Sequence, residues 1–233
     1  MRIGSAHFIF EDEKVTIPEG EQAKFDALPP EYSQLYLAIG GVLSAVICIS
    51  DPLREEAKDV LSTLRDLGVK NAVMLTGDSP RTAAAIAKEL GVDDFRAGVL
   101  PADKAEYVAA IRREGHTVLM VGDGINDSPA LSEADAGIAI SDGAAIAREI
   151  ADITIAADRL WELVRLRQLA MALMVRIQNN YRFVIGFNGA LIGLGVAGIL
   201  PPTTSAMLHN LSTLGVSLHS MSALPVLKPE KRL

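Results

Sequence analysis

The chain has 233 residues, which is enough for one large domain or two small ones. Its formal net charge of −7 argues against a nucleic-acid partner, because proteins that bind nucleic acids are usually basic. The single cysteine, Cys48, excludes an internal disulfide framework and fits a reducing compartment. Since Cys48 lies in an apolar strand pattern, we interpret it as a small core residue.

Residues 1–30 contain short apolar runs, of which Val15-Thr16-Ile17 is a candidate strand. From about residue 35 to 156, strand and helix patterns alternate, which predicts an α/β domain with a mostly parallel sheet and flanking helices. Gly40-Gly41 between two apolar runs predicts a hairpin. The expected strands are 35–39, 42–49, 72–75, 117–121, 136–140 and 152–155, and the expected helices are 53–67, 80–90 and 102–114.

The last third of the chain is strongly helical in pattern. Residues 158–180 carry an amphipathic pattern, and Phe183 to Leu200 contain no charge, which is long enough to be a candidate transmembrane segment. After the turn at Pro201-Pro202, residues 203–227 form a second uncharged stretch. We therefore expect a two-helix transmembrane hairpin with both ends facing the cytoplasm, the alternative being buried helices of a soluble domain.

The most informative motif runs from Gly122 to Leu131, Gly-Asp-Gly-Ile-Asn-Asp-Ser-Pro-Ala-Leu, directly after an apolar strand pattern. Such a strand places acidic side chains in the crevice at the carboxyl end of an α/β sheet. Asp123 and Asp127, with Asn126 near them, suit Mg²⁺ beside a phosphoryl group. The alternative is a plain strand-to-helix turn in which Asn126 or Asp127 caps the helix.

Three further motifs occur in order: Asp51-Pro52-Leu53-Arg54, Thr76-Gly77-Asp78, and Lys104 within Leu-Pro-Ala-Asp-Lys. Together with the acidic motif, these motifs resemble those of the P-type ATPases, which pass through an aspartyl-phosphate intermediate. Within that family, they are most similar to the heavy-metal-transporting branch. The resemblance covers nearly the whole chain. It implies a haloacid-dehalogenase-like phosphorylation domain, with ATP and Mg²⁺ as cofactors and a transition-metal ion as cargo.

The resemblance also assigns roles to single residues. Thr76 and Lys104 would contact the phosphoryl group, while Gly77 and Asp78 shape and support the turn. Asn126 would hydrogen-bond a phosphate oxygen or fix the loop, and Asp123 and Asp127 would hold Mg²⁺. The nucleotide contacts implied by the resemblance are Gly4, which an ordinary turn glycine explains equally well, and Asp51 and Arg54.

The chain departs from the family because no Asp-Lys-Thr-Gly-Thr motif is present, so the phosphorylated aspartate is missing. We therefore expect a C-terminal fragment, incomplete in its sheet, that does not form a phosphoenzyme alone and whose partner is the missing N-terminal part of the same pump. The expected parts are a nucleotide-binding remnant and linker (1–30), part of the phosphorylation domain (31–157), an amphipathic stalk helix (158–182), the transmembrane hairpin (183–227) and a cytoplasmic tail (228–233).

Polar residues in the hairpin are candidates for binding the transported ion, because polar groups inside a bilayer are costly and usually functional. They are Asn188, His209, Asn210 and Thr213. Imidazole and oxygen ligands suit Zn²⁺, Co²⁺, Mn²⁺ or Ni²⁺, while Met207 and Met221 keep copper open. The alternative for each polar residue is a hydrogen bond between helices, so the sequence leaves the metal unassigned.

The expected location is a membrane, with a lipid bilayer as partner and a cytoplasmic catalytic domain, most simply in a bacterial plasma membrane. Two other functions compete with a pump. One is a soluble haloacid-dehalogenase-type phosphatase, which needs a nucleophilic Asp-x-Asp that does not precede Thr76. The other is a non-catalytic truncated membrane protein that binds metal or a partner subunit.

Overall fold

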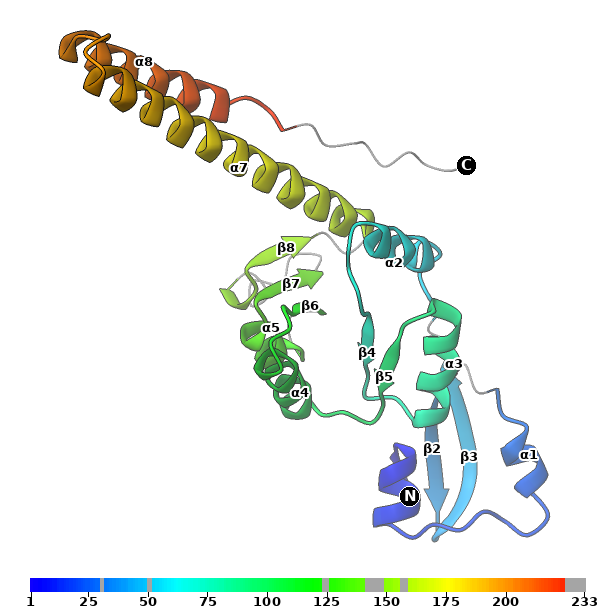
Figure 1. Cartoon of the computed structure of the whole chain (residues 1–233). Coiled ribbons are helices and arrows are strands. Elements are labelled where there is room, and N and C mark those ends of the chain that lie inside the picture. Colours follow the sequence, from blue (N-terminus) through cyan, green and yellow to red (C-terminus); the bar gives the residue numbers. More distant parts are fainter. Residues whose placement is uncertain (30–31, 50–51, 123–125, 141–148, 156–158, 225–233) are drawn as a thin grey trace. The chain divides into compact units, whose positions relative to one another are not determined.

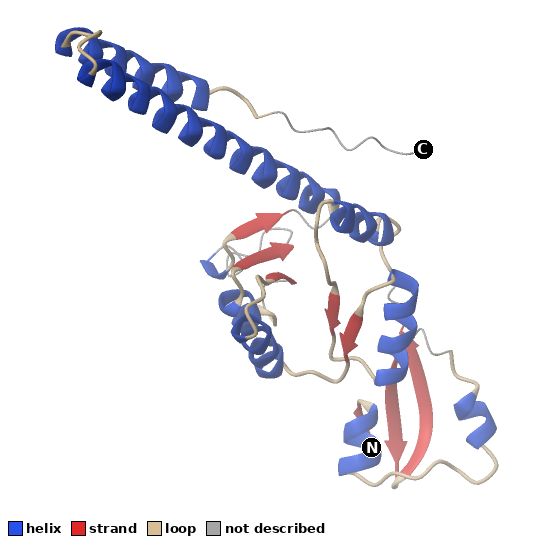
Figure 2. Cartoon of the chain, viewed as in Figure 1, coloured by secondary structure: helices blue, strands red, loops and turns tan. Residues whose placement is uncertain are grey.

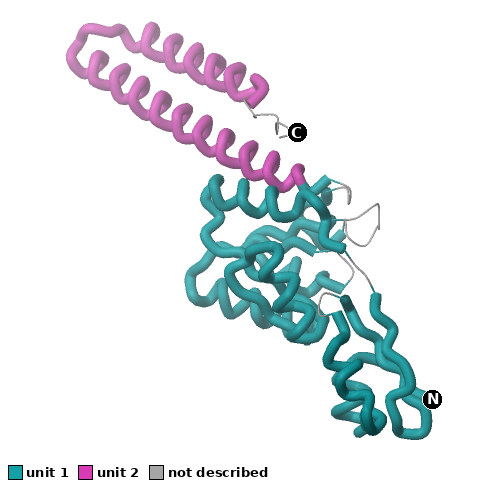
Figure 3. The backbone as a smooth tube through the Cα atoms, turned by 90° about the vertical axis from the view of Figure 1, so that its right-hand side faces the viewer, with its two compact units in different colours: residues 1–160 teal, residues 161–233 magenta. Residues whose placement is uncertain are grey.

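The computed structural model describes residues 1–29, 32–49, 52–122, 126–140, 149–155 and 159–224. The chain divides into two compact units, residues 1–160 and residues 161–233 (Figure 3). The elements of the first unit are β1 (Arg2–Gly4), the π-helix η1 (His7–Asp12), α1 (Gln22–Asp26), β2 (Ser33–Ile39), β3 (Val42–Ile49), α2 (Ala57–Asp66), β4 (Val73–Leu75), α3 (Pro80–Leu90), β5 (Asp94–Arg96), α4 (Pro101–Arg113), β6 (Leu119–Gly122), α5 (Ser128–Glu133), β7 (Ala136–Ile140) and β8 (Ile153–Ile155) (Figure 1). The second unit contains α7 (Trp161–Val196) and α8 (Pro202–Ser220).

The strands described in the first unit form three separate sheets, where the sequence predicts one mostly parallel sheet (Figure 2). β1, β2 and β3 are antiparallel, whereas β4 pairs with β5, and β6 with β7 and then β8, all in parallel. The expected strand at 15–17 is an isolated bridge from Thr16 to Val42. The α/β class with parallel pairing is confirmed, and the single continuous sheet is corrected to three short ones.

Local turn and cap chemistry explains the best-predicted elements. Gly40 and Gly41 have φ of 62° and 83°, which a two-residue turn between β2 and β3 requires. Helix α3 begins with Pro80 at its first position, and the Ser79 hydroxyl accepts the amide of Thr82 at 3.3 Å. It ends at Gly91, whose φ of 72° is the left-handed C-cap conformation.

An aspartate tethers the N-terminal ends of each parallel strand pair. Asp93, Asp135 and Asp152 each lie one residue before β5, β7 and β8. Their carboxylates accept the amides of Ala72 at 2.7 Å, Val118 at 2.8 Å and Gly137 at 2.8 Å, and each of these lies one residue before the first register partner in the neighbouring strand. We call this contact the aspartate tether. It fixes the register of each pair from its N-terminal end.

Two of the tethers also bind an arginine from the helix that leads into the first strand of the pair. Arg65 of α2 donates to Asp93 at 3.0 Å, and Arg112 of α4 donates to Asp135 at 3.1 Å. The backbone amide holds the pKa of each carboxyl below its usual range, and the arginine adds to the shift.

The cores of the first unit are small and local. One lies around the antiparallel sheet and contains Ile9, Val15, Tyr36, Ala38 and Leu43, with the rings of Phe10 and Phe25 packed against Tyr36. Another lies between α5 and β7, where Leu131 and Ala139 are buried and Met120 of β6 packs against them. Cys48 is exposed, which corrects its interpretation as a core residue: β3 is the outer strand of its sheet.

In the second unit, α7 and α8 form a helical hairpin joined at 197–201, close to the turn expected at Pro201-Pro202 (Figure 1). α7 is continuous from Trp161 to Val196, so the amphipathic and uncharged stretches belong to one helix. Arg176 and Asn180 of α7 bind the C-terminal end of α8: Arg176 donates to the carbonyls of Ser222 at 2.5 Å and Ala223 at 3.0 Å, and Asn180 donates to the Ser220 hydroxyl at 2.9 Å.

Among the described residues, no helix combines the length and the apolar character that crossing a bilayer requires. The uncharged part of α7, Phe183 to Val196, spans about 21 Å at ~1.5 Å per residue, against a hydrocarbon core of about 30 Å. In α8, serine, threonine, histidine and asparagine side chains lower the apolar character. The helical hairpin is confirmed, whereas the described helices do not support the transmembrane span that the sequence predicts.

We expect acid to weaken the first unit through the aspartate tethers. Because the folded-state pKa values of Asp93 and Asp135 lie below the unfolded value of about 3.9, their contribution is fully present above that value. It is lost as the pH falls below 3.9 through the folded pKa. Urea midpoints measured from pH 6 to pH 2.5 should fall less steeply for Asp135→Asn than for the parent, whereas Glu19→Gln, in an exposed turn, should follow the parent. Identical slopes for Asp135→Asn and the parent would refute this role.

Gly137→Ala should destabilise the first unit. A Cβ at this position in β7 would lie 2.6 Å from the backbone oxygen of Leu131 in α5, and backbone cannot move aside cheaply. The expected loss in the free energy of unfolding is about 1–3 kcal/mol. The matched control is Gly186→Ala in α7, where nothing lies within 4 Å and alanine favours helix. Thermal unfolding of both variants checks this, and an unchanged midpoint for Gly137→Ala would contradict it.

Candidate functional site

Thr76 lies in the loop at the carboxyl end of β4, and backbone hydrogen bonds to the neighbouring chain hold it there. Its amide donates to the Arg96 carbonyl at 3.0 Å, and its carbonyl accepts the amide of Val99 at 3.0 Å. Its hydroxyl donates to the Asp78 carboxylate at 2.7 Å and accepts the Asp78 amide at 3.1 Å. The hydroxyl is therefore fixed in orientation by Asp78. Gly77 lies between the two, where an added Cβ would lie 3.8 Å from the Val99 carbonyl oxygen.

Lys104 and Asp127 form a half-enclosed ion pair at the carboxyl end of β6. The Lys104 Nζ lies 2.7 Å from the Asp127 Oδ1, and the two side chains are 14% and 13% exposed. Asp127 sits close over Gly122, where an added Cβ would approach the Asp127 Cβ to 2.6 Å, so the glycine is required for this approach. Low exposure makes this pair stronger than an ordinary surface salt bridge.

The short segment after β5 links the Thr76 loop to this ion pair. Val99 binds the Thr76 carbonyl, and the next residue, Leu100, is the N-cap of α4. Lys104 lies in the first turn of α4, where its amide donates to the Leu100 carbonyl. The segments that follow β4, β5 and β6 thus place the Thr76 hydroxyl, the Lys104 ammonium and the Asp127 carboxylate at the carboxyl ends of parallel strands. Ligands of α/β proteins bind at these ends.

The other predicted site residues of this unit either lie outside the described residues or occupy other parts of the fold. Asp123 and Asp51 lie outside the described residues. Asn126 lies in the turn before α5, and the Arg54 carbonyl accepts the amide of Ala57 as the chain enters α2. Gly4 is the last residue of β1 and pairs with Tyr36.

The donor set fits Mg²⁺ only in part within the described residues. A carboxylate such as that of Asp127 is a hard oxygen ligand of the kind Mg²⁺ prefers. No group of three or more His, Cys, Asp or Glu side chains gathers to hold a metal ion in the described parts of the chain. The pair of carboxylates that the sequence predicts includes Asp123, so the described half of the site is Asp127 and its neighbours.

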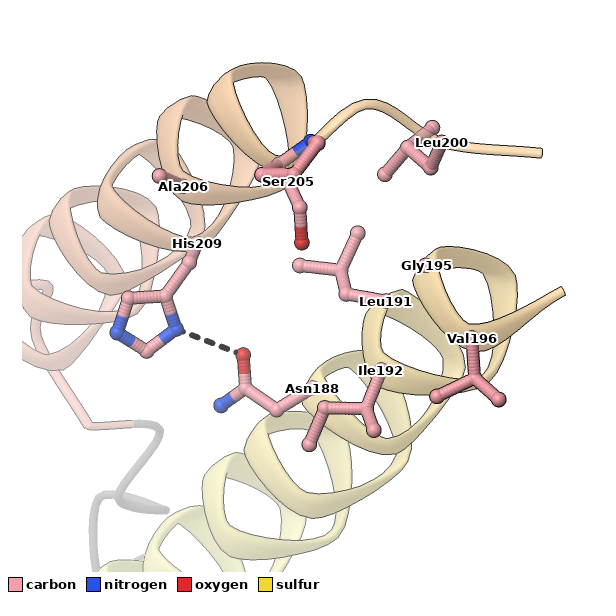
Figure 4. A pocket seen from close by; sticks show the side chains of 10 residues that line it. Asn188, Leu191, Ile192, Gly195, Val196, Leu200, Ser205, Ala206 and His209 are labelled. Carbon is pink, nitrogen blue, oxygen red and sulfur yellow. Dashed lines mark hydrogen bonds between the residues drawn. The ribbon is translucent and has the colours of Figure 1, made fainter. Parts of the chain in front are cut away.

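In the second unit, two of the four predicted ion-binding residues meet between α7 and α8. The His209 Nδ1 lies 2.8 Å from the Asn188 Oδ1, and both side chains line a cavity of about 630 Å³ (Figure 4). The cavity wall is otherwise mostly apolar, with Leu191, Ile192 and Val196 on the α7 side. Because the Asn188 oxygen is an acceptor, the Nδ1 of His209 carries the proton and the Nε2 keeps its lone pair when the ring is neutral.

Thr213 and Asn210 are not part of this cavity lining. The Thr213 hydroxyl donates to the His209 carbonyl at 3.1 Å, which is the usual back-bond of a helical threonine. Ser205 and Ala206, which sequence reasoning did not select, line the cavity one turn before His209.

Sequence reasoning also missed Ser33, at the start of β2. Its hydroxyl donates to the Asp78 carboxylate at 2.8 Å across 45 residues of sequence. A serine that begins a strand carries no motif, so spacing alone gives no signal for this contact.

Comparison with known proteins shows the family of the chain and several proteins that it resembles. The model of the haloacid dehalogenase-like hydrolases matches residues 3–135. A zinc-exporting P-type ATPase of Mycobacterium marinum is 42% identical over 87% of this chain, and a manganese-exporting P-type ATPase of Mycobacterium leprae is 44% identical over 80%. A copper-transporting ATPase of Rhizobium meliloti is 42% identical over 76% of the chain.

A solved zinc-transporting PIB-type ATPase in its E2·Pi state superposes with a TM-score of 0.74 and 33% identity over 88% of this chain. The chain spans only 29% and 26% of the zinc- and manganese-exporting relatives and 34% of the solved pump. The chain therefore belongs to the haloacid dehalogenase-like hydrolases, and over most of its length it is similar to a portion of heavy-metal P-type ATPases.

Proposed function

We propose that this chain supplies the phosphate-contacting and Mg²⁺-binding half of the phosphorylation domain in an ATP-driven pump for transition-metal cations. The observation that carries the proposal is the half-enclosed Lys104–Asp127 pair, joined through the Val99 segment to the Thr76 loop. Such a site offers a hydroxyl, a point positive charge and a hard anionic ligand. These are the groups that phosphoryl transfer needs, because the protein's main task there is positioning and charge neutralisation.

Each residue has a distinct role in this proposal. The Thr76 hydroxyl and the Lys104 ammonium bind oxygens of the phosphoryl group, with Gly77 leaving room for it and Asp78 orienting Thr76. Asp127 and Asp123 would hold Mg²⁺, which neutralises phosphoryl charge when bound, and Asn126 supports the same loop. Gly4, Asp51 and Arg54 are proposed to contact ATP, by resemblance alone.

The nucleophile must come from another segment. The 233 residues contain no Asp-Lys-Thr-Gly-Thr, so we infer that the phosphorylated aspartate belongs to a part of the pump outside them. β4 pairs only with β5 and β6 only with β7 in the described sheets, which leaves one edge of each strand for a further strand. Thr76 and Asp127 follow these two strands, so a strand between them would end beside both residues.

The cargo is proposed to be a divalent transition-metal ion, with His209 as its ligand in this chain. Asn188 holds the proton on the Nδ1, which leaves the Nε2 for a metal, as a carbonyl-type partner commonly does for ligand histidines. Asn210 and Thr213 remain candidate oxygen ligands from the same helix. The names of the relatives favour zinc or manganese among the ions that imidazole and oxygen suit. A pump of this kind would act at a membrane, as we predict from the sequence.

Lys104→Met tests the phosphate site. The variant keeps the aliphatic length and removes the ammonium, so binding of inorganic phosphate in the presence of MgCl₂ should weaken about ten- to a hundredfold, as expected for a hydrogen bond to a charged group. Binding of Mg²⁺ alone should persist, because its proposed ligands are carboxylates. Calorimetric titration measures both affinities in the full chain.

The matched control for this test is Lys88→Met, an exposed lysine in α3. It should bind phosphate as the parent does. If Lys104→Met and Lys88→Met bind phosphate with the parent's affinity, or if the parent binds none, the proposed phosphate site is wrong.

His209→Ala tests the cargo site. Removing the imidazole should lower the affinity of the full chain for Zn²⁺ at least about tenfold, which is the loss expected when a metal ligand's shell is disturbed. Competition with a chromophoric zinc chelator measures it. His219→Ala, on the same helix but absent from the cavity lining, is the control. Equal losses for the two histidine variants would rule out His209 as the specific ligand.

A further inference from the structure

We propose that Ser33 is a positioning residue for the phosphate-contacting Thr76 and acts through the Asp78 carboxylate. The proposal deepens the function proposed above and rests on it. The Asp78 carboxylate accepts two hydroxyl protons, from Ser33 on Oδ1 at 2.8 Å and from Thr76 on Oδ2 at 2.7 Å. One hydroxyl comes from the antiparallel sheet and the other from the loop after β4, so the carboxylate joins the two.

The single proton of the Thr76 hydroxyl is already donated in this structure. A threonine hydroxyl has one proton, and here that proton is donated to Asp78. Its oxygen also accepts the Asp78 amide at 3.1 Å. Thr76 therefore has no proton to give to a phosphoryl oxygen in this state, and binding a phosphoryl group by donation requires the hydroxyl to turn away from Asp78.

Turning Thr76 removes one of the two donors from a half-buried carboxylate. A partly buried carboxylate that loses a hydrogen bond costs free energy, and that cost opposes ligand binding. The Ser33 hydroxyl is the described donor that remains on Asp78 after the turn. The Ser33–Asp78 hydrogen bond therefore stabilises the phosphate-bound state more than the empty state. Only such a difference in stabilisation changes the affinity for phosphate.

The chain before Ser33 is also held to helix α3, which follows the Thr76 loop, and these contacts keep Ser33 in place. The Thr82 hydroxyl donates to the Tyr32 carbonyl at 3.4 Å, next to Ser33. Arg81 donates to the carbonyls of Asp26 and Leu28 at 3.2 and 3.1 Å. Because these contacts do not involve the Ser33 hydroxyl, its removal should leave the two segments together and change only the support of Asp78.

The test is titration of the full chain with inorganic phosphate at saturating MgCl₂, followed by ³¹P NMR. Ser33→Ala should weaken phosphate binding about three- to tenfold, the range expected for one hydrogen bond. Ser33→Thr, which keeps the hydroxyl, should restore the parent affinity. The control is Ser44→Ala in β3, whose hydroxyl bonds only a local carbonyl in the described structure. Both variants should still unfold cooperatively on heating, which shows that each is folded.

Amide hydrogen exchange at Asp78 adds a second readout. In Ser33→Ala it should rise more in the phosphate-bound chain than in the free chain, whereas a purely structural role would raise both alike. Should Ser33→Ala fail to fold, Ser33→Cys, which keeps the volume and bonds weakly, is expected to show the same loss of affinity.

Thr76→Val separates this inference from the proposed function. If Thr76→Val loses phosphate affinity while Ser33→Ala and Ser33→Cys match the parent, Ser33 does not position Thr76 and the inference alone is wrong. If Thr76→Val binds phosphate as well as the parent does, the proposed phosphate site is wrong and the inference fails with it.

Discussion

The aspartate tether is the interaction on which the arrangement of the parallel strands depends. These strands are short, with three to five residues each, so few ladder hydrogen bonds specify their register. An aspartate one residue before the second strand, bound to the amide one residue before the first register partner, defines that register at one end. Once the N-terminal ends are aligned, the carboxyl ends of the strands are aligned too, and that is where Thr76 and Asp127 lie.

Helix α4 connects this constraint to the candidate site. Its last turn provides Arg112, which binds Asp135 at the N-terminal end of the β6–β7 pair, and its first turn provides Lys104, which binds Asp127 near the carboxyl end of β6. The helix is thus attached at both ends to structure flanking the same strand. These two contacts hold Lys104 in place beside Asp127, which is the N-cap of α5. A site built on rigid elements in this way needs little rearrangement to neutralise a phosphoryl group.

The sequence predicted those elements whose ends are defined by capping or turn residues. It failed for elements whose formation depends on pairing with distant parts of the chain. Proline and glycine located α3 to the residue, and Gly40-Gly41 located the hairpin, because cap and turn conformations depend on local residues. β5 was missed because Asp94-Phe95-Arg96 has a single apolar side chain and is a strand only through pairing with β4. The stalk at 158–182 and the uncharged segment after it were assigned to separate parts because their compositions differ, and the structure joins them in the single helix α7. The division into three sheets and the exposure of Cys48 likewise depend on which strands find partners.

In the candidate site, too, local motifs predicted single residues, whereas the contacts between them depend on the fold. Motifs identified Thr76, Lys104 and Asp127, but the ion pair between two of them and the contribution of Ser33 came only from the fold. In both units a neighbouring oxygen fixes the proton of the candidate group: Asp78 takes the proton of Thr76, and Asn188 takes that of the His209 Nδ1. The consequences differ because the ligands differ. A metal needs a lone pair, which His209 already offers at Nε2, whereas a phosphoryl oxygen needs a proton, which Thr76 must first withdraw from Asp78. The proposed cation site is therefore arranged for binding as it stands, and the proposed phosphate site requires a hydrogen-bond exchange before it can donate.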